Sequence, residues 1–355
     1  MKKSKIRVFE AFSGIGAQRK ALENLGIDHE VVAISEIDKY AIASYEAIFG
    51  KTLNVGDIST LDPQEITDHD LFTYSFPCQD ISVAGKQKGL DMDSGTRSGL
   101  LWECQKLIAA KKPKYLLMEN VKNLVGKKHK HNFDKWLEWL ESQGYTNFYQ
   151  ILNAKDYGVP QNRERVFVVS VLDKDIEYQF PTGRGTKKTL EEILEQEVAE
   201  KYYFSNEKLE TLKFRQEPAS ELKHIADLEI SNRQDLNRVY DPTGICPTLN
   251  TMQGGHRQPK IIQIGRGFNK GGLHEISQTV TSSGFEQNNF LANGGMVRKL
   301  TPLECWRLMG FEDIDFEKAA RVNSNSQLYK QAGNSIVVPV LEGIFENLFL
   351  PERGS

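Results

Sequence analysis

The stretch IRVFEAFSGIGA, residues 6–17, decides the fold. Residues 6–12 are mostly apolar and β-prone, and they run directly into a turn at 13–16 that contains Gly14 and Gly16. Helix-forming residues follow at 17–25. Because glycine has no Cβ, such a turn lets the backbone pass close to a ligand. The stretch therefore predicts a strand, a ligand-side turn and a helix.

Strand-like and helix-like segments continue to alternate through the first half of the chain. Further strands are predicted at 31–35, 71–75, 115–119, 148–152 and 166–172, and further helices at 39–49, 99–110 and 132–142. This alternation predicts a Rossmann-like α/β fold, with an open, mostly parallel sheet and helices on both faces. Ligands of such sheets bind beyond the carboxyl ends of the strands.

The pattern changes after about residue 174. With 355 residues the chain is longer than one core usually requires, so two domains are expected. Residues 189–201 are acidic and predict a helix, whereas 250–300 are rich in Gly, Asn, Gln, Ser and Thr and hold six Lys/Arg against two Asp/Glu. We expect a separate, loop-rich domain at 179–296. Residues 335–350 are apolar at helical spacing and should pack back onto the first domain.

Composition narrows the classes of function. The net charge of −3 neither requires nor forbids nucleic acid, so a DNA-binding surface would have to be local. No apolar run reaches membrane-spanning length, and no secretory signal is recognised. The spacing of the cysteines predicts no metal site, and a reducing cytoplasm in which a free thiol could work is expected. The cysteines are Cys78, Cys104, Cys246 and Cys305.

An acid follows the second predicted strand in a position that suits a nucleoside. Glu36 lies 20 residues after Gly16, where a carboxylate can accept both ribose hydroxyls of an adenosyl group. A dinucleotide fingerprint would place glycine at its third position, but Arg19 stands there, which favours a ligand without phosphates. Asp57 could accept from the adenine amino group, Ile58 could form an apolar wall and Phe12 could cover the ring. The alternative is a tight turn beside an exposed acid.

A cysteine stands where the third strand ends. Cys78 follows Pro77, which stiffens its approach, and the carboxyl end of the strand is the ligand side of the sheet. The alternative, a small buried core residue, suits most lone cysteines. The glycine-rich, polar residues that follow disfavour it and predict a loop that closes over a substrate. Those glycines are Gly85, Gly89, Gly95 and Gly99.

Two further strands supply an acid and a pair of arginines. Glu119 leaves an apolar strand at the active edge, where burial would raise the pKa of its carboxyl and let it carry a proton. A solvated acid at a strand end is the alternative. Arg163 and Arg165 alternate on an extended segment and should project together, unless they only form surface ion pairs with Glu164.

These segments, in this order, resemble the DNA cytosine-5 methyltransferases of the bacterial and phage restriction-modification type, over nearly the whole chain. The resemblance rests on residues 12–16, Glu36 with Asp57, the segment Pro77-Cys78-Gln79, and residues 119–121, 161–165, 298–311 and 331–335. It implies a methyltransferase fold with a smaller target recognition domain. The implied division is a catalytic domain at 1–178, the recognition domain with its supporting segment at 179–311, and a returning C-terminal segment at 312–355.

The resemblance also implies chemistry. Cys78 would add to carbon 6 of cytosine, Glu119 would bond to ring nitrogen 3, Arg165 would hold the base carbonyl and Arg163 would assist in positioning. S-adenosylmethionine would be the methyl donor, with S-adenosylhomocysteine as product. Ile37 stands where this family often has a large aromatic. The implied cofactor residues are Phe12, Gly14, Gly16, Glu36, Ile37, Asp57, Ile58, Pro77, Asn334 and Ile336.

A cytosine stacked in a duplex cannot meet a thiol, so the target base must be swung out of double-stranded DNA. The short threonine-apolar signature of recognition domains is matched by Thr248-Leu249, which we favour, and by Thr279-Val280. We expect a monomer, and both a cognate restriction endonuclease and an orphan enzyme are compatible with the sequence. A tRNA cytosine methyltransferase and a catalytically silent DNA-binding relative are the alternatives. The candidate DNA contacts are Gln79, Ser82, Thr248, Leu249, Arg257, Lys260, Arg266 and Lys270.

Overall fold

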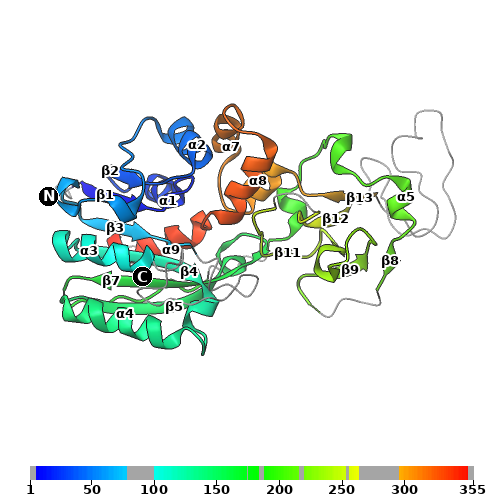
Figure 1. The fold of residues 1–355 in the computed structure, drawn as a ribbon. Helices are drawn as coiled ribbons and strands as arrows, with labels where there is room; N and C mark the ends of the chain where they lie inside the picture. Colours follow the sequence, from blue (N-terminus) through cyan, green and yellow to red (C-terminus); the bar gives the residue numbers. More distant parts are fainter. Residues whose placement is uncertain are drawn as a thin grey trace.

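A computed structural model describes residues 5–77, 100–173, 175–183, 188–215, 220–252, 256–263 and 296–350. Its larger lobe is built on a six-stranded sheet in the order β2-β1-β3-β4-β7-β5 (Figure 1). Strands β2, β1, β3 and β4 pair in parallel, and β7 runs antiparallel to both of its neighbours. The predicted open, mostly parallel sheet is confirmed. The strands are β1 (Ile6–Ala11), β2 (His29–Ser35), β3 (Leu71–Tyr74), β4 (Tyr115–Val121), β5 (Thr146–Asn153) and β7 (Glu164–Val171).

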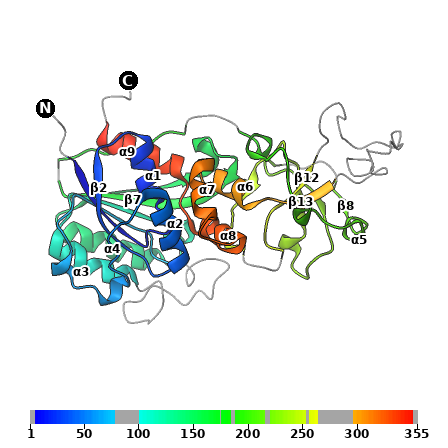
Figure 2. The same cartoon turned by 90° about the horizontal axis from the view of Figure 1, so that it is seen from above.

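Helices cover both faces of this sheet because successive strand residues point to opposite sides. On β1, Val8 packs into the cluster that includes α1 and α9, whereas Phe9 packs into the cluster that includes α3 and α4. Figure 2 shows the same sandwich from above. The helices of this lobe are α1 (Ala17–Asn24), α2 (Lys39–Phe49), α3 (Leu101–Lys111), α4 (Lys130–Ser142) and α9 (Val338–Phe349).

The C-terminal helix returns to the first lobe, as predicted. Leu341, Ile344 and Phe345 of α9 join the same apolar cluster as Ala21 and Leu22 of α1. Joining the two ends of the chain in one core stabilises both, since each helix alone would expose its apolar face. The first strand, the first helix and the C-terminal helix therefore share one core.

The smaller lobe contains a five-stranded sheet, in the order β13-β12-β10-β9-β8, beyond one end of the larger lobe (Figures 1 and 2). Its own apolar cluster is small and includes Ala226, Val239 and Val297. The division of the chain at 178 and 311 remains a prediction. The elements of this lobe are α5 (Asn206–Leu209), β8 (Lys213–Phe214), β9 (His224–Asp227), β10 (Arg238–Tyr240), β12 (Lys260–Gln263) and β13 (Met296–Lys299).

Short elements connect the lobes. Trp306 of α6 is fully buried in the large core, and Lys20 of α1 lies 2.9 Å from the carboxylate of Asp315 on α7. Strands β6 and β11 pair in parallel where the two lobes meet. No helix among the described residues is long and apolar enough to cross a membrane. The connecting elements are β6 (Gln161–Asn162), β11 (Cys246–Pro247), α6 (Pro302–Arg307), α7 (Asp313–Ala320) and α8 (Asn325–Asn334).

The predicted acidic helix at 189–201 is wrong. Two 3-10 helices, Leu190–Ile193 and Glu200–Tyr202, stand there instead. The first starts with a capping box at Thr189 but ends at once, because Glu195 is held elsewhere: its N–H donates to Glu304, and its carboxylate accepts from Thr301. Tertiary hydrogen bonds to α6 outweigh the local helical preference.

Candidate functional site

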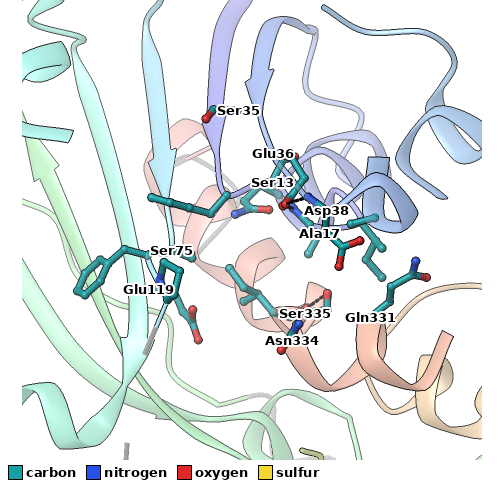
Figure 3. A pocket seen from close by; sticks show the side chains of 18 of the residues that line it. Ser13, Ala17, Ser35, Glu36, Asp38, Ser75, Glu119, Gln331, Asn334 and Ser335 are labelled. Atoms are coloured by element: carbon teal, nitrogen blue, oxygen red, sulfur yellow. Dashed lines mark hydrogen bonds between the residues drawn. The ribbon is translucent and has the colours of Figure 1, made fainter. Parts of the chain in front are cut away.

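A cavity of about 550 Å³ opens at the carboxyl ends of β1, β2, β3 and β4. Figure 3 shows Glu119 and Ser75 on one side of it, Glu36 and Asp38 on another, and Asn334 and Ser335 along a third. The predicted cofactor residues and the predicted catalytic residues Glu119, Arg163 and Arg165 therefore line one cavity. It lies at the edge of the sheet where ligands were expected. The predicted residues that line it are Phe12, Gly14, Glu36, Ile37, Asp57, Ile58, Pro77, Glu119, Arg163, Arg165, Asn334 and Ile336.

Gly16 is placed differently from its prediction, because it does not line the cavity. Its φ is +79°, and a Cβ at this position would lie 2.5 Å from Phe49 Cε2 and 2.8 Å from Tyr45 Cε2. The requirement for glycine therefore comes from the close packing of the turn on α2. Gly14, also in the left-handed region, does line the cavity.

Glu36 is fixed by backbone donors at the end of β2. Its Oε2 accepts from the N–H of Gly14 at 2.9 Å, and its Oε1 accepts from the N–H groups of Ile37 and Asp38, both at 2.8 Å. The carboxylate is thus held on the cavity wall before any ligand arrives. Ile37 beside it has 74% of its surface exposed, so it could cover a ligand at the rim only.

One side of the cavity combines a polar acceptor with an apolar wall. Asp57 begins a short 3-10 helix, and its Oδ1 accepts from the N–H and the hydroxyl of Ser59. Ile58 next to it is buried. The two residues that the sequence assigns to the adenine therefore lie side by side on the cavity wall.

The cations that line the cavity are already engaged with protein groups. Lys330 lies 2.7 Å from the Asp38 carboxylate, Arg165 lies 3.2 Å from Glu119, and Arg163 donates to backbone carbonyls. Because the described cations of the wall have these partners, the cavity suits a cofactor without phosphates, and S-adenosylmethionine fits. The Asp38–Lys330 pair was not foreseen, since nothing in the sequence links positions so far apart.

Glu119 lies near the end of β4, with only 8% of its surface exposed. Burial raises the pKa of its carboxyl, and the nearby Arg165 and Arg163 and a hydrogen bond from Ser75 oppose this rise. The next residue, Asn120, donates its side-chain N–H to the carbonyl of Phe76 at 3.0 Å. Asn120 therefore ties the acid-bearing strand to the segment that leads toward residue 78. The sequence signal for it was its place in the segment Glu119-Asn120-Val121.

Arg163 and Arg165 both line the cavity but differ in their partners. Arg165 pairs with Glu119. The guanidinium of Arg163 donates to the carbonyl oxygens of Leu249 at 3.0 Å, Gly333 at 3.1 Å and Ser335 at 2.8 Å. With 4% of its surface exposed, Arg163 is committed to backbone groups.

Two predicted DNA contacts are wrong. Lys260 has only 2% of its surface exposed, and its Nζ donates to the carbonyls of His256 and Gln258. Burial, followed by repulsion from Lys299, lowers the pKa of Lys260 to about 7. Leu249 is buried too, so its side chain is unavailable at the surface. The local sequence could not reveal either burial, because the groups that bond to Lys260 and to Leu249 come together only in the assembled fold.

Other predicted contacts stay compatible with a DNA-facing role. Thr248 and Arg257 are exposed, and the hydroxyl of Thr248 donates to the carbonyl of Asn162. The remaining predicted positions lie outside the described residues; they are Cys78, Gln79, Ser82, Arg266, Lys270, Thr279 and Val280, together with Gly85, Gly89, Gly95 and Gly99 of the predicted loop. The described chain reaches the cavity at Pro77, one residue before the predicted nucleophile.

Comparison with solved structures shows the same fold at low sequence identity. The methyltransferase EhMeth of Entamoeba histolytica superposes with a TM-score of 0.71 at 19% identity, covering 98% of this chain and 99% of that chain. The S. pombe Dnmt2 methyltransferase gives a TM-score of 0.67 at 21% identity, with the same coverage. Both share the Rossmann-like methyltransferase architecture.

Sequence comparison goes further. The type II methyltransferase M2.ScrFI of Lactococcus lactis subsp. cremoris is 41% identical, over 97% of this chain and 99% of the relative. The orphan methyltransferase M.SPBetaI of Bacillus phage SPbeta is 36% identical, over 97% of this chain and 98% of the relative. The model of the C-5 cytosine-specific DNA methylases matches residues 6–350. The chain thus belongs to the C-5 cytosine-specific DNA methylase family.

Proposed function

We propose that this DNA cytosine-5 methyltransferase works through Cys78 as nucleophile, Glu119 as proton-bearing acid and Arg165 as carbonyl clamp, with S-adenosylmethionine as methyl donor. One observation carries the proposal. The Glu119–Arg165 pair and the Glu36 turn line the same cavity, so a base and a nucleoside cofactor bound there would be neighbours.

The chemistry explains why a cysteine is needed. Carbon 5 of cytosine is a poor nucleophile, and addition of a thiolate to carbon 6 pushes electron density onto carbon 5. S-adenosylmethionine, when bound, supplies an electrophilic methyl group. Loss of the proton from carbon 5 then lets the Cys78–carbon 6 bond break. Pro77, which directly precedes Cys78 in the sequence, lines the cavity, and this supports the assignment of Cys78.

Glu119 and Arg165 prepare the ring for this addition. Because burial raises the pKa of the Glu119 carboxyl, a larger fraction of it holds a proton near neutral pH. A protonated carboxyl can donate to ring nitrogen 3 and make carbon 6 more electrophilic. Arg165, 3.2 Å from Glu119, supplies positive charge for the base carbonyl as negative charge develops.

The cofactor would be held by residues from four segments. Glu36 accepts the ribose hydroxyls, Asp57 accepts the adenine amino group and Ile58 packs against the ring. Pro77, Asn334 and Ile336 complete the wall. Neutral or acidic protein groups predominate at these positions, as a cofactor with a sulfonium charge requires.

The partner we propose is double-stranded DNA with its target cytosine turned out of the helix. Glu119 is almost fully buried, so a base stacked in a duplex cannot reach it. We place this reaction in the cytoplasm and expect a monomeric enzyme, and a cognate restriction endonuclease or an orphan role both agree with it.

Methyl uptake tests the proposal. Labelled S-adenosylmethionine is supplied with unmethylated genomic duplex DNA or with tRNA, and 5-methylcytosine is mapped at base resolution. We expect label in DNA at one recurrent sequence, none in tRNA, and none with Cys78→Ala. Label confined to tRNA would establish the RNA enzyme instead, and no label in either would leave a DNA-binding relative.

A further inference from the structure

Hydrogen bonds join residues 160–163 of the large lobe to the segment 246–249. The N–H of Cys246 donates to the carbonyl of Pro160 at 2.7 Å, and the β6–β11 pairing follows. The hydroxyl of Thr248 then donates to the carbonyl of Asn162 at 2.6 Å. Three successive contacts of this kind fix the register between the two segments.

Gln161 fixes this register from inside. Its side chain is fully buried; its Oε1 accepts from the N–H of Leu249, and its Nε2 donates to the carbonyl of Leu308 at 2.7 Å. Both ends of the amide are therefore used. A glutamate at position 161 would have no side-chain N–H, so the carbonyl of Leu308 would lose its donor.

Arg163 links the segment 246–249 to the residues at the end of α8, beside the predicted cofactor site. Of its three carbonyl acceptors, Leu249 belongs to the segment 246–249, whereas Gly333 and Ser335 lie at the end of α8. The last carbonyls of a helix lack intrahelical donors, and a cation there is favourable. Arg163 therefore caps α8 and holds Leu249 with the same guanidinium.

The two segments that Arg163 holds are in direct backbone contact. A Cβ added at Gly333 would lie 2.0 Å from the carbonyl oxygen of Asn250. The two backbones are therefore packed too closely to leave room for a side chain at position 333. Asn334, Ser335 and Ile336, which follow Gly333, line the cavity beside the predicted cofactor groups (Figure 3).

We propose that Arg163 is a positioning residue that couples DNA contact at the exposed Thr248, next to Leu249, to cofactor binding at residues 333–336. This inference rests on the proposed function, because it assumes DNA on one side and S-adenosylmethionine on the other. Linkage makes the coupling reciprocal: whatever factor DNA adds to cofactor affinity, the cofactor adds to DNA affinity. In the part of the chain that the structure describes, the bonds of Arg165 go to Glu119 and to the carbonyl of Glu164, so we give it no part in this coupling.

The test is a binding measurement. Calorimetry gives the Kd of S-adenosylhomocysteine alone and with a short duplex that carries the mapped recognition sequence, and the ratio of the two is the coupling factor. We expect a factor of about five or more in the native protein. In Arg163→Lys, which keeps the charge but loses the planar fork, we expect the factor to fall toward one, with a smaller change in the Kd measured without DNA.

A matched control separates this role from general docking of the lobes. Lys155 also bridges the lobes, through Glu221, but it does not reach residues 333–335. Lys155→Met should keep the native coupling factor. Thr248→Val removes the hydrogen bond from the Thr248 hydroxyl to the carbonyl of Asn162 at an exposed position. This variant should lower the coupling factor part of the way, and it replaces the Arg163 variants as the test if those unfold.

Three results would overturn the inference. They are a native coupling factor of one, an unchanged factor in Arg163→Lys and Thr248→Val, or an equal loss of coupling in Lys155→Met. A failure of the proposed function would look different, because then the native protein would methylate no DNA at all.

Discussion

Glu119 is the residue on which the chemistry can be tested most simply. Glu119→Ala should slow methyl transfer by about 10²–10⁴-fold, the usual contribution of a general acid, while the affinity for S-adenosylhomocysteine changes little. In the native enzyme the single-turnover rate should fall as pH rises through the raised pKa of Glu119, because the active form holds the proton. Near-normal turnover in the variant would refute the assignment. So would a single-turnover rate of the native enzyme that does not fall as pH rises.

Glu10 predicts a pH effect on stability. Its side chain is fully buried on β1, accepts from the Tyr45 hydroxyl at 2.7 Å, and burial raises its pKa to about 7. As pH rises, this carboxyl ionises at a lower pH in the unfolded chain than in the folded protein. The free energy of unfolding therefore falls between pH 4.5 and about 7, by up to roughly 3 kcal/mol. Glu10→Gln should be more stable than the native protein at pH 8 and similar at pH 4. Urea unfolding at both values checks this, and an equal effect at both would contradict it.

Single residues show how far sequence reasoning reaches. The places of Glu36 and Glu119 on the cavity wall were predictable because each lies at or near the end of a strand, and strand ends can be predicted from the hydrophobic pattern. Lys260 was misjudged, because a lysine in a polar stretch is normally solvated. Its burial depends on strands β10 and β13, whose positions a local pattern does not contain.

At the scale of elements, the turn between β1 and α1 offers a matched pair of variants. Gly16→Ala would push a Cβ into Phe49 and Tyr45 in a left-handed conformation, whereas Gly14→Ala meets nothing within 4 Å. We expect Gly16→Ala to destabilise by several kcal/mol and Gly14→Ala by about 1 kcal/mol. Urea unfolding measures both. Equal losses would mean that packing on α2 is not the reason for Gly16.

Element types were predictable where the pattern was regular. The strands and helices at 6–49 agree with the structure to within about two residues, because each carries a clear apolar period and a polar boundary. The failed helix at 189–201 shows the opposite case. Its acidic residues favour a helix locally, but Glu195 bonds to Glu304 and Thr301 at the start of α6 and does not continue the turn.

For the molecule as a whole, the buried Arg298–Glu304 pair joins the five-stranded sheet of the smaller lobe to α6. The two side chains form paired bonds of 2.8 and 2.7 Å and are almost fully buried. Arg298→Met would strand a buried carboxylate and should cost about 3–5 kcal/mol. Adding Glu304→Gln should recover part of that loss in thermal or urea unfolding. No recovery in the double variant would mean that packing, and not charge, sets the cost.

The two-lobed arrangement itself was only partly predictable. A change of composition near residue 174 indicated a second domain, but nothing in the sequence showed that 160–163 and 246–249 would pair, or that Arg163 would reach α8. Contacts between segments so distant along the chain follow from the assembled fold. The surface that reads DNA belongs to the same class of unpredictable features.

The central claim, a covalent bond between Cys78 and the target cytosine, is tested most directly by trapping. A duplex whose target carries 5-fluorocytosine cannot lose the group at carbon 5, so the adduct should persist through denaturing electrophoresis when S-adenosylmethionine is present. We predict a stable complex with the native protein whose cross-linked peptide contains Cys78, and none with Cys78→Ala. A DNA-methylating enzyme that forms no complex, or a complex that survives in Cys78→Ala, would contradict this account.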